Sequence, residues 1–479
     1  TMTLTDLLEP WQAGLADGSI VPYLGPGVLA DVASLADGRS MPATSEQLIL
    51  AMNGGRPMAP KLMYEFPRAA MNVELKRGRS AVTRFLDSTY GATRWTRAAL
   101  HDWLATVRPP YVIVPNHVCM VDPFMVGSNV PVPVHWIASD GNMRTRIMRA
   151  LLRLVGTIPK SKHIPDLQTI NGIVEVVRKR KGVVGIFPEG TASFDGHTQA
   201  LVPATGKLLK LLKVPVVTPV LKGAFYSLPR WSWTRRRGAL EIEFKVALTT
   251  EDIKRLSPDE ILSRVEASLE HDEAEWLAAR GVPFSGRRKR AEHLETVLFQ
   301  CPSCGEVGRM RSSEDRFLCE SCGQASRLDR YYRFRPAEGR PPRFSTIREW
   351  SLWQEEAFRD YLKERVSKDD GKPIFSDPGV LVLKGWRLSP LRRIRIGTLS
   401  MYRDRIELAP LTGRPLAFPL AEVEGEGVLK RNLLEFYRGR SVYQVRFPTR
   451  RSSARQWMMA ISILRVPDLS GLGQGSAAG

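Results

Sequence analysis

Long apolar runs are missing from this chain. No stretch reaches the roughly 18 uninterrupted apolar residues of a membrane-crossing helix, so the sequence predicts no transmembrane segment. The first residues, Thr1 to Asp6, lack the basic start and apolar centre of a signal peptide, and we expect none there. Cysteine is also scarce, with 5 among 479 residues, which excludes a small disulfide-bonded scaffold and favours a reducing compartment.

Acidic residues are outnumbered by basic ones. The chain has 50 aspartates and glutamates against 70 lysines and arginines, a formal net charge of +20. This excess favours anionic partners, such as a membrane surface, a phosphorylated substrate or a nucleic acid, although free use of arginine by the genome would give the same balance. With 43% apolar and 25% charged residues, the composition is that of a globular protein, and the length predicts several domains.

A histidine and an aspartate follow a short β-type run at 111–114. They are His117 and Asp122, and Glu189 follows a second such run at 183–187. Side chains at strand ends point into the crevice where open α/β sheets bind ligands. A neutral imidazole takes a proton from a hydroxyl near pH 7, and a nearby carboxylate fixes its tautomer. The pattern therefore predicts base-catalysed attack by an alcohol, without an enzyme nucleophile.

The two motifs together resemble those of the glycerolipid acyltransferases, the family typified by 1-acyl-glycerol-3-phosphate acyltransferase. N-H-x4-D spans 116–122 and F-P-E-G-T spans 187–191, each directly after a strand-like run and in the family's order. The resemblance implies that His117 deprotonates the acceptor hydroxyl and that Asp122 orients the imidazole. It also implies that the hydroxyl attacks the thioester of acyl-CoA or acyl carrier protein.

The resemblance further implies a set of substrate-binding residues. Glu189, Gly190 and Thr191 would bind the glycerol-phosphate part of the acceptor, and Asn116 belongs to the same motif as the histidine. Glycine lets a backbone approach closely, and threonine offers a hydroxyl. Lys160 stands where the family's G-x-x-x-x-R element has arginine and would bind phosphate as a point charge. An ordinary solvated lysine is the alternative for this position.

Two positions depart from the family's pattern. Ala192 replaces the arginine that usually follows the threonine, which removes one expected phosphate contact. Cys119 replaces the usual serine. Because this position does not hold the base, we expect activity to be kept. A covalent acyl-cysteine at Cys119 is the alternative interpretation.

Four of the five cysteines form two C-x2-C pairs, at 301–304 and 319–322. Two such turns supply four thiolates for a tetrahedral Zn²⁺, so the predicted ligands are Cys301, Cys304, Cys319 and Cys322. Since these thiolates fill every position around the metal, we expect a structural zinc ribbon. A ribbon behind such an acyltransferase domain resembles a known bacterial arrangement of the family. Zinc ribbons also occur in nucleic-acid proteins.

Strand-like and helix-like runs alternate over 109–270, which predicts an α/β acyltransferase domain. A helical linker with the zinc ribbon is expected at 271–335 and a helical connector at 336–377. Residues 378–467 contain short strands and one amphipathic helix, and resemble a pleckstrin-homology-like β-barrel plus helix. Its basic loops would bind lipid headgroups. The alternatives are a domain that binds other proteins and a domain with a purely structural role. The glycine-rich tail, 468–479, is expected to be flexible.

The N-terminal segment, 1–108, is expected to form a separate α/β unit. Residues 19–29 are typical of a strand, a glycine turn and a helix start. Residues 15–116 resemble the start of sirtuin-like NAD-binding domains. The catalytic histidine segment of those domains has no counterpart, so the resemblance does not imply NAD chemistry here.

A basic amphipathic helix is predicted at 144–155, where four arginines alternate with apolar residues: Arg144, Arg146, Arg149 and Arg153. Such a helix suits an anionic lipid surface, or packs on a core with a solvated basic face. Trp231, Trp233 and the arginines at 235–237 would extend a membrane-facing surface.

The sequence therefore predicts a bacterial cytoplasmic enzyme, peripheral on the inner face of the cell membrane. It would move a fatty acyl group from acyl-CoA or acyl carrier protein to a lysophospholipid, expected to be 1-acyl-glycerol-3-phosphate, in phospholipid biosynthesis. Its expected partners are an anionic membrane surface, the lysophospholipid and the acyl donor, but not nucleic acid. The rival is a zinc-ribbon scaffold with an inactive acyltransferase fold, and the intact His117 and Asp122 favour the enzyme.

Overall fold

The chain divides into two compact units. One comprises 1–109 with 127–132, and the other comprises 110–126 with 133–479. The computed structural model describes residues 32–34, 38–42, 44–63, 65–91, 109–160, 167–285, 289–337, 341–368, 371–448 and 452–466. The strand and turn predicted at 19–29 and the tail at 468–479 lie outside the described residues, as does much of the sirtuin-like segment.

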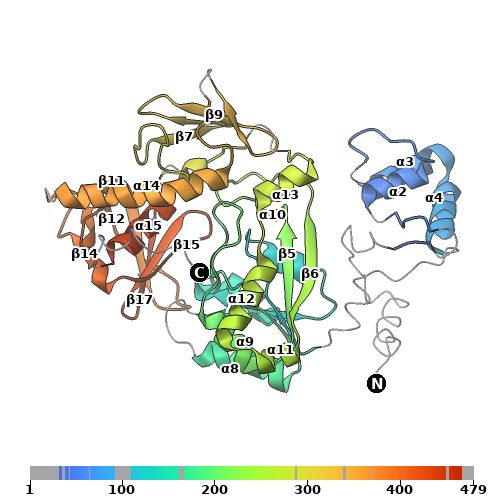
Figure 1. Ribbon diagram of the computed structural model, residues 1–479, viewed down its shortest axis with the longest axis horizontal. Helices are drawn as coiled ribbons and strands as arrows, with labels where there is room; N and C mark the ends of the chain where they lie inside the picture. The colour runs from blue at the N-terminus through green and yellow to red at the C-terminus, as the bar shows by residue number, and fades with distance from the viewer. Residues whose placement is uncertain are drawn as a thin grey trace. The chain divides into compact units, whose positions relative to one another are not determined.

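The described residues of the first unit are mainly helical (Figure 1). The elements are α2 (Ser45–Met52), α3 (Phe66–Arg77), α4 (Arg79–Leu86) and a π-helical turn (Asp87–Gly91). Helix α2 begins at a capping box, in which Thr44 and Gln47 exchange hydrogen bonds. A small core around Ile49, Ala69 and Val73 joins α2 to α3.

An α/β domain opens the second unit, as the alternating pattern predicts. Among the described residues, its six strands lie in the order β3-β2-β4-β1-β5-β6. They are β1 (Val112–Ile113), β2 (Val134–Ser139), β3 (Ile158–Lys160), β4 (Val183–Gly185), β5 (Val216–Lys222) and β6 (Glu241–Leu248). The first five are parallel and β6 is antiparallel at the edge. Parallel strands end at one edge of the sheet, where α/β proteins bind ligands.

Helices cover one face of this sheet closely. Val112, Val184 and Val216 point into a core shared with α8, α9, α11 and α12, which lie together in Figure 1. The helices of the domain are α6 (Asp122–Gly127), α7 (Arg146–Leu154), α8 (Leu167–Val174), α9 (Ala204–Leu212), α10 (Ala224–Ser227), α11 (Thr250–Arg255) and α12 (Pro258–Leu269), with a 3-10 turn (Asp140–Met143) and a π-helical turn (Glu175–Lys179). Side chains alternate along a strand, so the neighbouring positions face the other side.

A small antiparallel sheet carries the paired cysteines. After α13 (Glu273–Arg280) and a 3-10 turn (Leu294–Thr296), four strands among the described residues lie in the order β10-β9-β8-β7. They are β7 (Met310–Ser313), β8 (Arg316–Cys319), β9 (Ala325–Leu328) and β10 (Phe334–Pro336). The long helix α14 (Ile347–Lys368) packs Trp350 against Phe317 and Phe334, with ring centroids 5.3 and 5.1 Å away.

The described C-terminal part is a seven-stranded antiparallel sheet with one helix (Figure 1). Its order is β14-β13-β12-β11-β17-β16-β15. The elements are β11 (Phe375–Gly385), β12 (Arg392–Met401), β13 (Arg405–Pro410), β14 (Leu416–Pro419), a 3-10 turn (Leu420–Glu422), β15 (Glu424–Leu429), β16 (Leu433–Arg438), β17 (Ser441–Arg446) and α15 (Ala454–Leu464). The predicted apolar face of the last helix is confirmed, because Trp457, Ala460, Ile461 and Leu464 are buried.

The membrane-facing role expected for Trp231 is wrong. Its side chain is buried, its ring lies edge-on to Phe225 at 5.3 Å, and its Nε1 donates to the carbonyl of Arg290 at 3.4 Å. Arg236 is buried as well and donates to the carbonyl of Lys289 at 2.8 Å. This tryptophan–arginine segment fastens the α/β domain to the start of the cysteine-bearing module. Of the other residues in this prediction, Trp233, Arg235 and Arg237 are exposed.

Candidate active site

His117 and Asp122 form a hydrogen-bonded pair just beyond β1. Nδ1 of His117 lies 2.7 Å from Oδ2 of Asp122. The aspartate side chain is fully buried, whereas the imidazole remains 22% exposed. Since Asp122 occupies Nδ1, the other ring nitrogen, Nε2, is left to exchange protons with a substrate. The predicted catalytic pair is therefore brought together.

The loop between the two residues folds around the aspartate. Oδ2 of Asp122 accepts the backbone N–H groups of Val118 at 2.7 Å and Cys119 at 2.9 Å. Asp122 also begins α6, where a negative charge interacts favourably with the helix dipole. The backbone donors and the start of the helix thus hold the carboxylate in the position from which it orients the imidazole.

The second motif is fastened directly to the first. Oε1 of Glu189 accepts the backbone N–H of His117 at 2.5 Å, and its Oε2 accepts the N–H of Gln199 at 2.8 Å. The carbonyl of His117 in turn accepts the N–H of Ser193 at 2.8 Å. These contacts follow from the adjacency of β1 and β4 in the sheet. Glu189 therefore holds the backbone at His117, the predicted base.

Burial controls the ionisation of Glu189. The residue is 6% exposed, and desolvation raises the pKa of its carboxyl from 4.5 to about 8, with Asp122 and Asp195 adding to the rise. The two backbone donors act in the opposite direction but do not cancel it. Near pH 7 this side chain is largely protonated.

Aromatic rings support the imidazole from the side. The ring of Phe187 lies 4.3 Å from that of His117, centroid to centroid, and stacks on Trp136 at 5.1 Å. Gly185 makes room for this arrangement, because a Cβ there would lie 2.3 Å from the Trp136 ring. The sequence motif includes Phe187, but its contact with the histidine was not predicted from the sequence.

Asn116 lies beside the pair and binds the sheet. Its Oδ1 accepts the N–H of Leu221 at 2.7 Å, and its Nδ2 donates to the carbonyl of the same residue at 3.1 Å. These bonds close the end of β1 against the end of β5. In this structure the amide thus holds the strand end from which His117 projects.

The end of the second motif contacts a distant arginine. Gly190 has a φ of 69°, which lets the loop turn back, and Thr191 follows it. Nη1 of Arg230 donates to Oγ1 of Thr191 at 3.1 Å and to the carbonyl of Ala192 at 2.6 Å. Its Nη2 donates to the carbonyl of Val428, in β15. A guanidinium therefore does reach the loop at Ala192, but from elsewhere in the chain.

Arg230 belongs to a buried cation–π stack. Its guanidinium lies 4.4 Å from the ring of Phe194, and that of Arg455 lies 4.9 Å from the same ring. Burial and the charge of Arg455 lower the pKa of Arg230 to about 9, so it stays charged at neutral pH. No local sequence signal points to Arg230, because its partners lie in three separate parts of the chain.

Lys160 lies away from this cluster. It ends β3, and β2 and β4 separate that strand from β1. At the usual strand spacing, roughly 14 Å of sheet lies between the two strands. Lys160 is exposed at the same edge of the sheet.

Cys119 is an interior residue of the site loop. It is 4% exposed, and its Sγ donates to Oδ1 of Asp122 at 2.9 Å. Burial, followed by the charge of Asp122, raises the pKa of this thiol far above its usual range. A thiol that stays protonated is a poor nucleophile, which argues against the acyl-cysteine alternative.

The four paired cysteines do come together. Their sulfur atoms all lie within 4.8 Å of one another, and Sγ of Cys301 is 3.7 Å from that of Cys322, as is Cys304 from Cys319. In each pair a glycine with positive φ follows the second cysteine, and its N–H donates to the carbonyl of the first. Four zinc–sulfur bonds of about 2.3 Å would place the sulfurs roughly 3.8 Å apart. The cluster therefore fits a tetrahedral metal ion.

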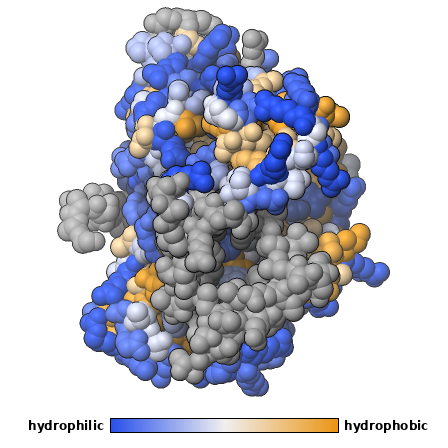
Figure 2. All heavy atoms as spheres, turned by 90° about the vertical axis from the view of Figure 1, so that its right-hand side faces the viewer, coloured by the Kyte–Doolittle hydropathy of each residue, from blue (hydrophilic) through white to orange (hydrophobic). Residues whose placement is uncertain are grey.

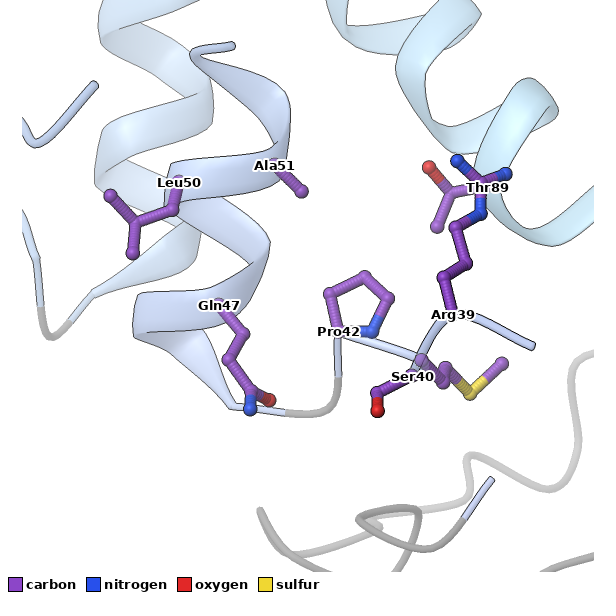
Figure 3. Close-up of a pocket in the computed structure, with 8 residues that line it drawn as sticks. Arg39, Ser40, Pro42, Gln47, Leu50, Ala51 and Thr89 are labelled. Carbon is purple, nitrogen blue, oxygen red and sulfur yellow. The ribbon is translucent and has the colours of Figure 1, made fainter. Parts of the chain in front are cut away.

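The first unit has an open hollow of about 340 Å³ between α2 and the segment around Pro42 (Figure 3). Gln47, Leu50 and Ala51 of α2 line one side, and Arg39 and Ser40 line another. It contains none of the residues that the sequence motifs single out.

Comparisons with known proteins agree with the motifs. A family model described as Acyltransferase matches residues 99–222. The 1-acyl-sn-glycerol-3-phosphate acyltransferase of Saccharomyces cerevisiae is 25% identical over 166 residues, which are 34% of this chain and 55% of the yeast protein. The chain thus spans about half the length of this curated relative.

Two solved structures also match in part. One is the 1-acyl-sn-glycerophosphate acyltransferase PlsC from Thermotoga maritima, with 16% identity, a TM-score of 0.29, and coverage of 46% of this chain and 91% of that one. The other is a chain of the 8S snRNP assembly intermediate, with 11% identity, a TM-score of 0.16, and coverage of 22% and 87%. At such TM-scores neither match adds to the argument on fold.

The parallel sheet, the His117–Asp122 pair at its edge and the matching family model define an α/β domain of the acyltransferase class. Residues 99–222 match the Acyltransferase family, and part of the chain is similar to a glycerophosphate acyltransferase.

Proposed function

We propose that the protein is an O-acyltransferase that acylates the free hydroxyl of a lysophospholipid, 1-acyl-glycerol-3-phosphate, in phospholipid biosynthesis. The observation that carries the proposal is the 2.7 Å contact between a partly exposed His117 and a buried Asp122 within the family-matched segment. Nε2 of His117 takes the proton of the hydroxyl, whose oxygen attacks the thioester carbonyl of acyl-CoA or acyl carrier protein. A C–O bond forms, the C–S bond breaks, and the leaving thiolate takes the proton from the imidazolium.

Acceptor binding is assigned to the loop that follows β4. Gly190 and Thr191 present backbone and hydroxyl groups next to the base, and Arg230 brings a positive charge to the same loop. Asn116 and Glu189 act by holding the backbone around His117. Lys160, at the same edge of the sheet, meets the outer part of the acceptor.

Mass spectrometry of acyl transfer tests the proposal. Long-chain acyl-CoA and acyl carrier protein are offered to a panel of lyso-acceptors with the wild type and His117→Ala. His293→Asn serves as a matched control, since His293 lies near the cysteine-bearing module and asparagine tolerates its positive φ of 59°. We expect transfer by the wild type and the control and its loss in His117→Ala. No transfer by a folded wild type would favour the scaffold alternative.

The accessory parts are assigned in the same way. The cysteine module, 271–335, is a structural zinc ribbon, supported by its sulfur spacing. The sheet and helix of 378–467 form a pleckstrin-homology-like domain, supported by seven antiparallel strands and α15. Between them, 336–377 connects through α14. The segment 1–108 is a separate sirtuin-like unit.

The proposed location is the cytoplasm, at the inner face of a bacterial cell membrane. Among the residues that the structure describes, no helix is both long and apolar enough to cross a bilayer. The partners proposed are the lysophospholipid, the acyl donor and an anionic membrane surface, and not nucleic acid. The net charge of +20 supports an anionic surface.

A further inference from the structure

Two arginines fasten helix α7 and the residues before it to the C-terminal part of the chain. Arg144, two residues before the helix, is buried and pairs with the buried Glu435 of β16 through two hydrogen bonds. Arg149 donates to the carbonyl of Met143 at 3.0 Å and to that of Leu388. Arg144 and Arg149 therefore hold this helix against the C-terminal part of the chain, whereas Arg146 and Arg153 stay exposed.

The apolar side of α7 also faces outward. None of its nine residues, all of them described, is buried. Ile147, Leu151 and Leu154 are 77%, 53% and 84% exposed, and their spacing puts them on one face of the helix. A surface helix normally turns its apolar face to the core and its charges to water. An apolar helix face that stays exposed favours binding to a hydrophobic partner.

A strand and loop of the C-terminal sheet continue this surface. Arg144 and Arg149 donate to the carbonyls of Arg387 and Leu388, so the loop at 386–391 lies against α7. The loop and the start of β12 also expose apolar and basic side chains: Trp386 (42%), Ile394 (38%), Ile396 (53%), Arg392, Arg393 and Arg395.

We propose that α7 and residues 386–396 form one docking surface for an anionic lipid bilayer. Exposed isoleucine, leucine and tryptophan insert at the boundary of headgroups and acyl chains, and arginines around them attract anionic headgroups. Charge complementarity distinguishes this partner, since apolar side chains mixed with exposed arginines suit an anionic interface better than a purely apolar one. On the face shown in Figure 2, hydrophilic and apolar residues alternate where the surface is coloured.

The docking surface begins at the same edge of the sheet as the proposed catalytic site. Helix α7 connects β2 to β3, and it starts at the edge where β1 delivers His117 and β4 delivers Glu189. Docking through α7 would bring this edge to the bilayer, where a lysophospholipid resides. This last step rests on the proposed function, whereas lipid binding itself does not require turnover.

Co-sedimentation with vesicles tests the surface. Full-length protein is mixed with vesicles of phosphatidylcholine alone or with added phosphatidylglycerol. Leu151→Glu is compared with Leu352→Glu, because Leu352 lies on α14 and is 51% exposed, close to the 53% of Leu151. We expect Leu151→Glu to weaken binding by at least roughly tenfold and Leu352→Glu to leave it unchanged.

The charge contribution is tested separately. Arg392→Gln and Arg393→Gln should each weaken binding to the anionic vesicles roughly fivefold, with little effect on neutral vesicles. Equal binding by Leu151→Glu and Leu352→Glu would overturn the proposal. So would a wild type that binds no vesicles but dimerises through Leu151, because a second copy of the chain would then cover the surface.

Binding and catalysis can fail independently. His117→Ala should sediment with vesicles as the wild type does, and Leu151→Glu should keep its turnover of a short-chain, water-soluble lyso-acceptor. Vesicle binding without any acyl transfer would reject the proposed function and leave the docking surface standing. Acyl transfer to the soluble acceptor without vesicle binding would reject the docking surface and leave the proposed function standing.

Discussion

The backbone N–H of His117 donates to the carboxyl of Glu189 at 2.5 Å, so the two sequence motifs meet at one hydrogen bond. The glutamate binds the backbone of His117, and Asp122 holds the imidazole of the same residue. In the proposed mechanism, the carboxyl in F-P-E-G-T would position His117 without touching the substrate. This division of roles can be tested by separate substitutions.

Asp122→Asn should remove most activity. An amide cannot accept all the bonds from Val118, Cys119 and His117 that the buried carboxylate accepts, and it no longer stabilises an imidazolium. We expect kcat to fall by roughly 10²–10⁴-fold and the free energy of unfolding by about 1–3 kcal/mol. Steady-state kinetics and urea unfolding measure the two effects, with Asp252→Asn in the capping box of α11 as the activity control. Unchanged kcat would exclude Asp122 from the mechanism.

Cys119→Ser should keep acyl transfer within a few fold. The thiol is buried and protonated, and a hydroxyl can make the same donation to Asp122. Activity measurements with Cys119→Ser and Cys119→Ala check this, together with a mass spectrum of the wild type after donor addition. Abolished transfer in both variants, with an acylated Cys119 in the wild type, would instead support a covalent intermediate.

Glu189 should make the protein less stable as the pH rises. Its pKa is about 8 when folded and near 4.5 when unfolded. Below the lower value both states are protonated, and the stabilising effect is complete. Between about pH 4.5 and 8 only the unfolded chain releases the proton, so the free energy of unfolding falls through this window.

Glu189→Gln isolates this pH dependence. The variant loses one acceptor, which costs about 1 kcal/mol at low pH, but it does not titrate. Its deficit relative to the wild type should therefore shrink or reverse between pH 5 and 8, as measured by urea unfolding. A deficit independent of pH would show that Glu189 does not titrate in this range.

Removal of the metal should lower the stability of the whole second unit, and not only that of the cysteine-bearing module. We expect one zinc ion per chain by elemental analysis, and loss of metal in Cys301→Ser but not in Cys119→Ser. Since Trp350 of α14 packs on the module, a chelator should lower the Tm of the whole unit and quench or shift tryptophan fluorescence. Full stability of a metal-free chain would contradict a structural site.

Sequence patterns predicted the parts of the fold that are determined by residues close together in the chain. Alternating apolar runs predicted the parallel strands, and the chain order of two motifs placed His117 and Glu189 at one sheet edge. Irregular strands give a weaker sequence pattern. β11 has Pro378 and Gly379 at a register shift, and β15 has Gly425 at another, so neither shows regular alternation.

The sequence could not show which way an amphipathic face points. The spacing of Ile147, Leu151 and Leu154 predicts that they share a face, but the inward turn of Arg144 depends on Glu435, far along the chain. Trp231 was assigned to the surface for the same reason, since its partner Phe225 is visible only in the folded domain. No local sequence pattern indicated Arg230, because its contacts form only between segments that are distant in the chain.

The stack of Phe194 between Arg230 and Arg455 also sets an order of assembly. Proteins are synthesised from the N-terminus, so the catalytic loop leaves the ribosome well before β15 and α15. Until those last elements fold, the loop lacks its bond to Val428 and one of its two flanking cations. A nascent chain therefore carries His117 and Asp122 but not a locked acceptor loop, and we expect acylation to begin only after translation of the C-terminal helix.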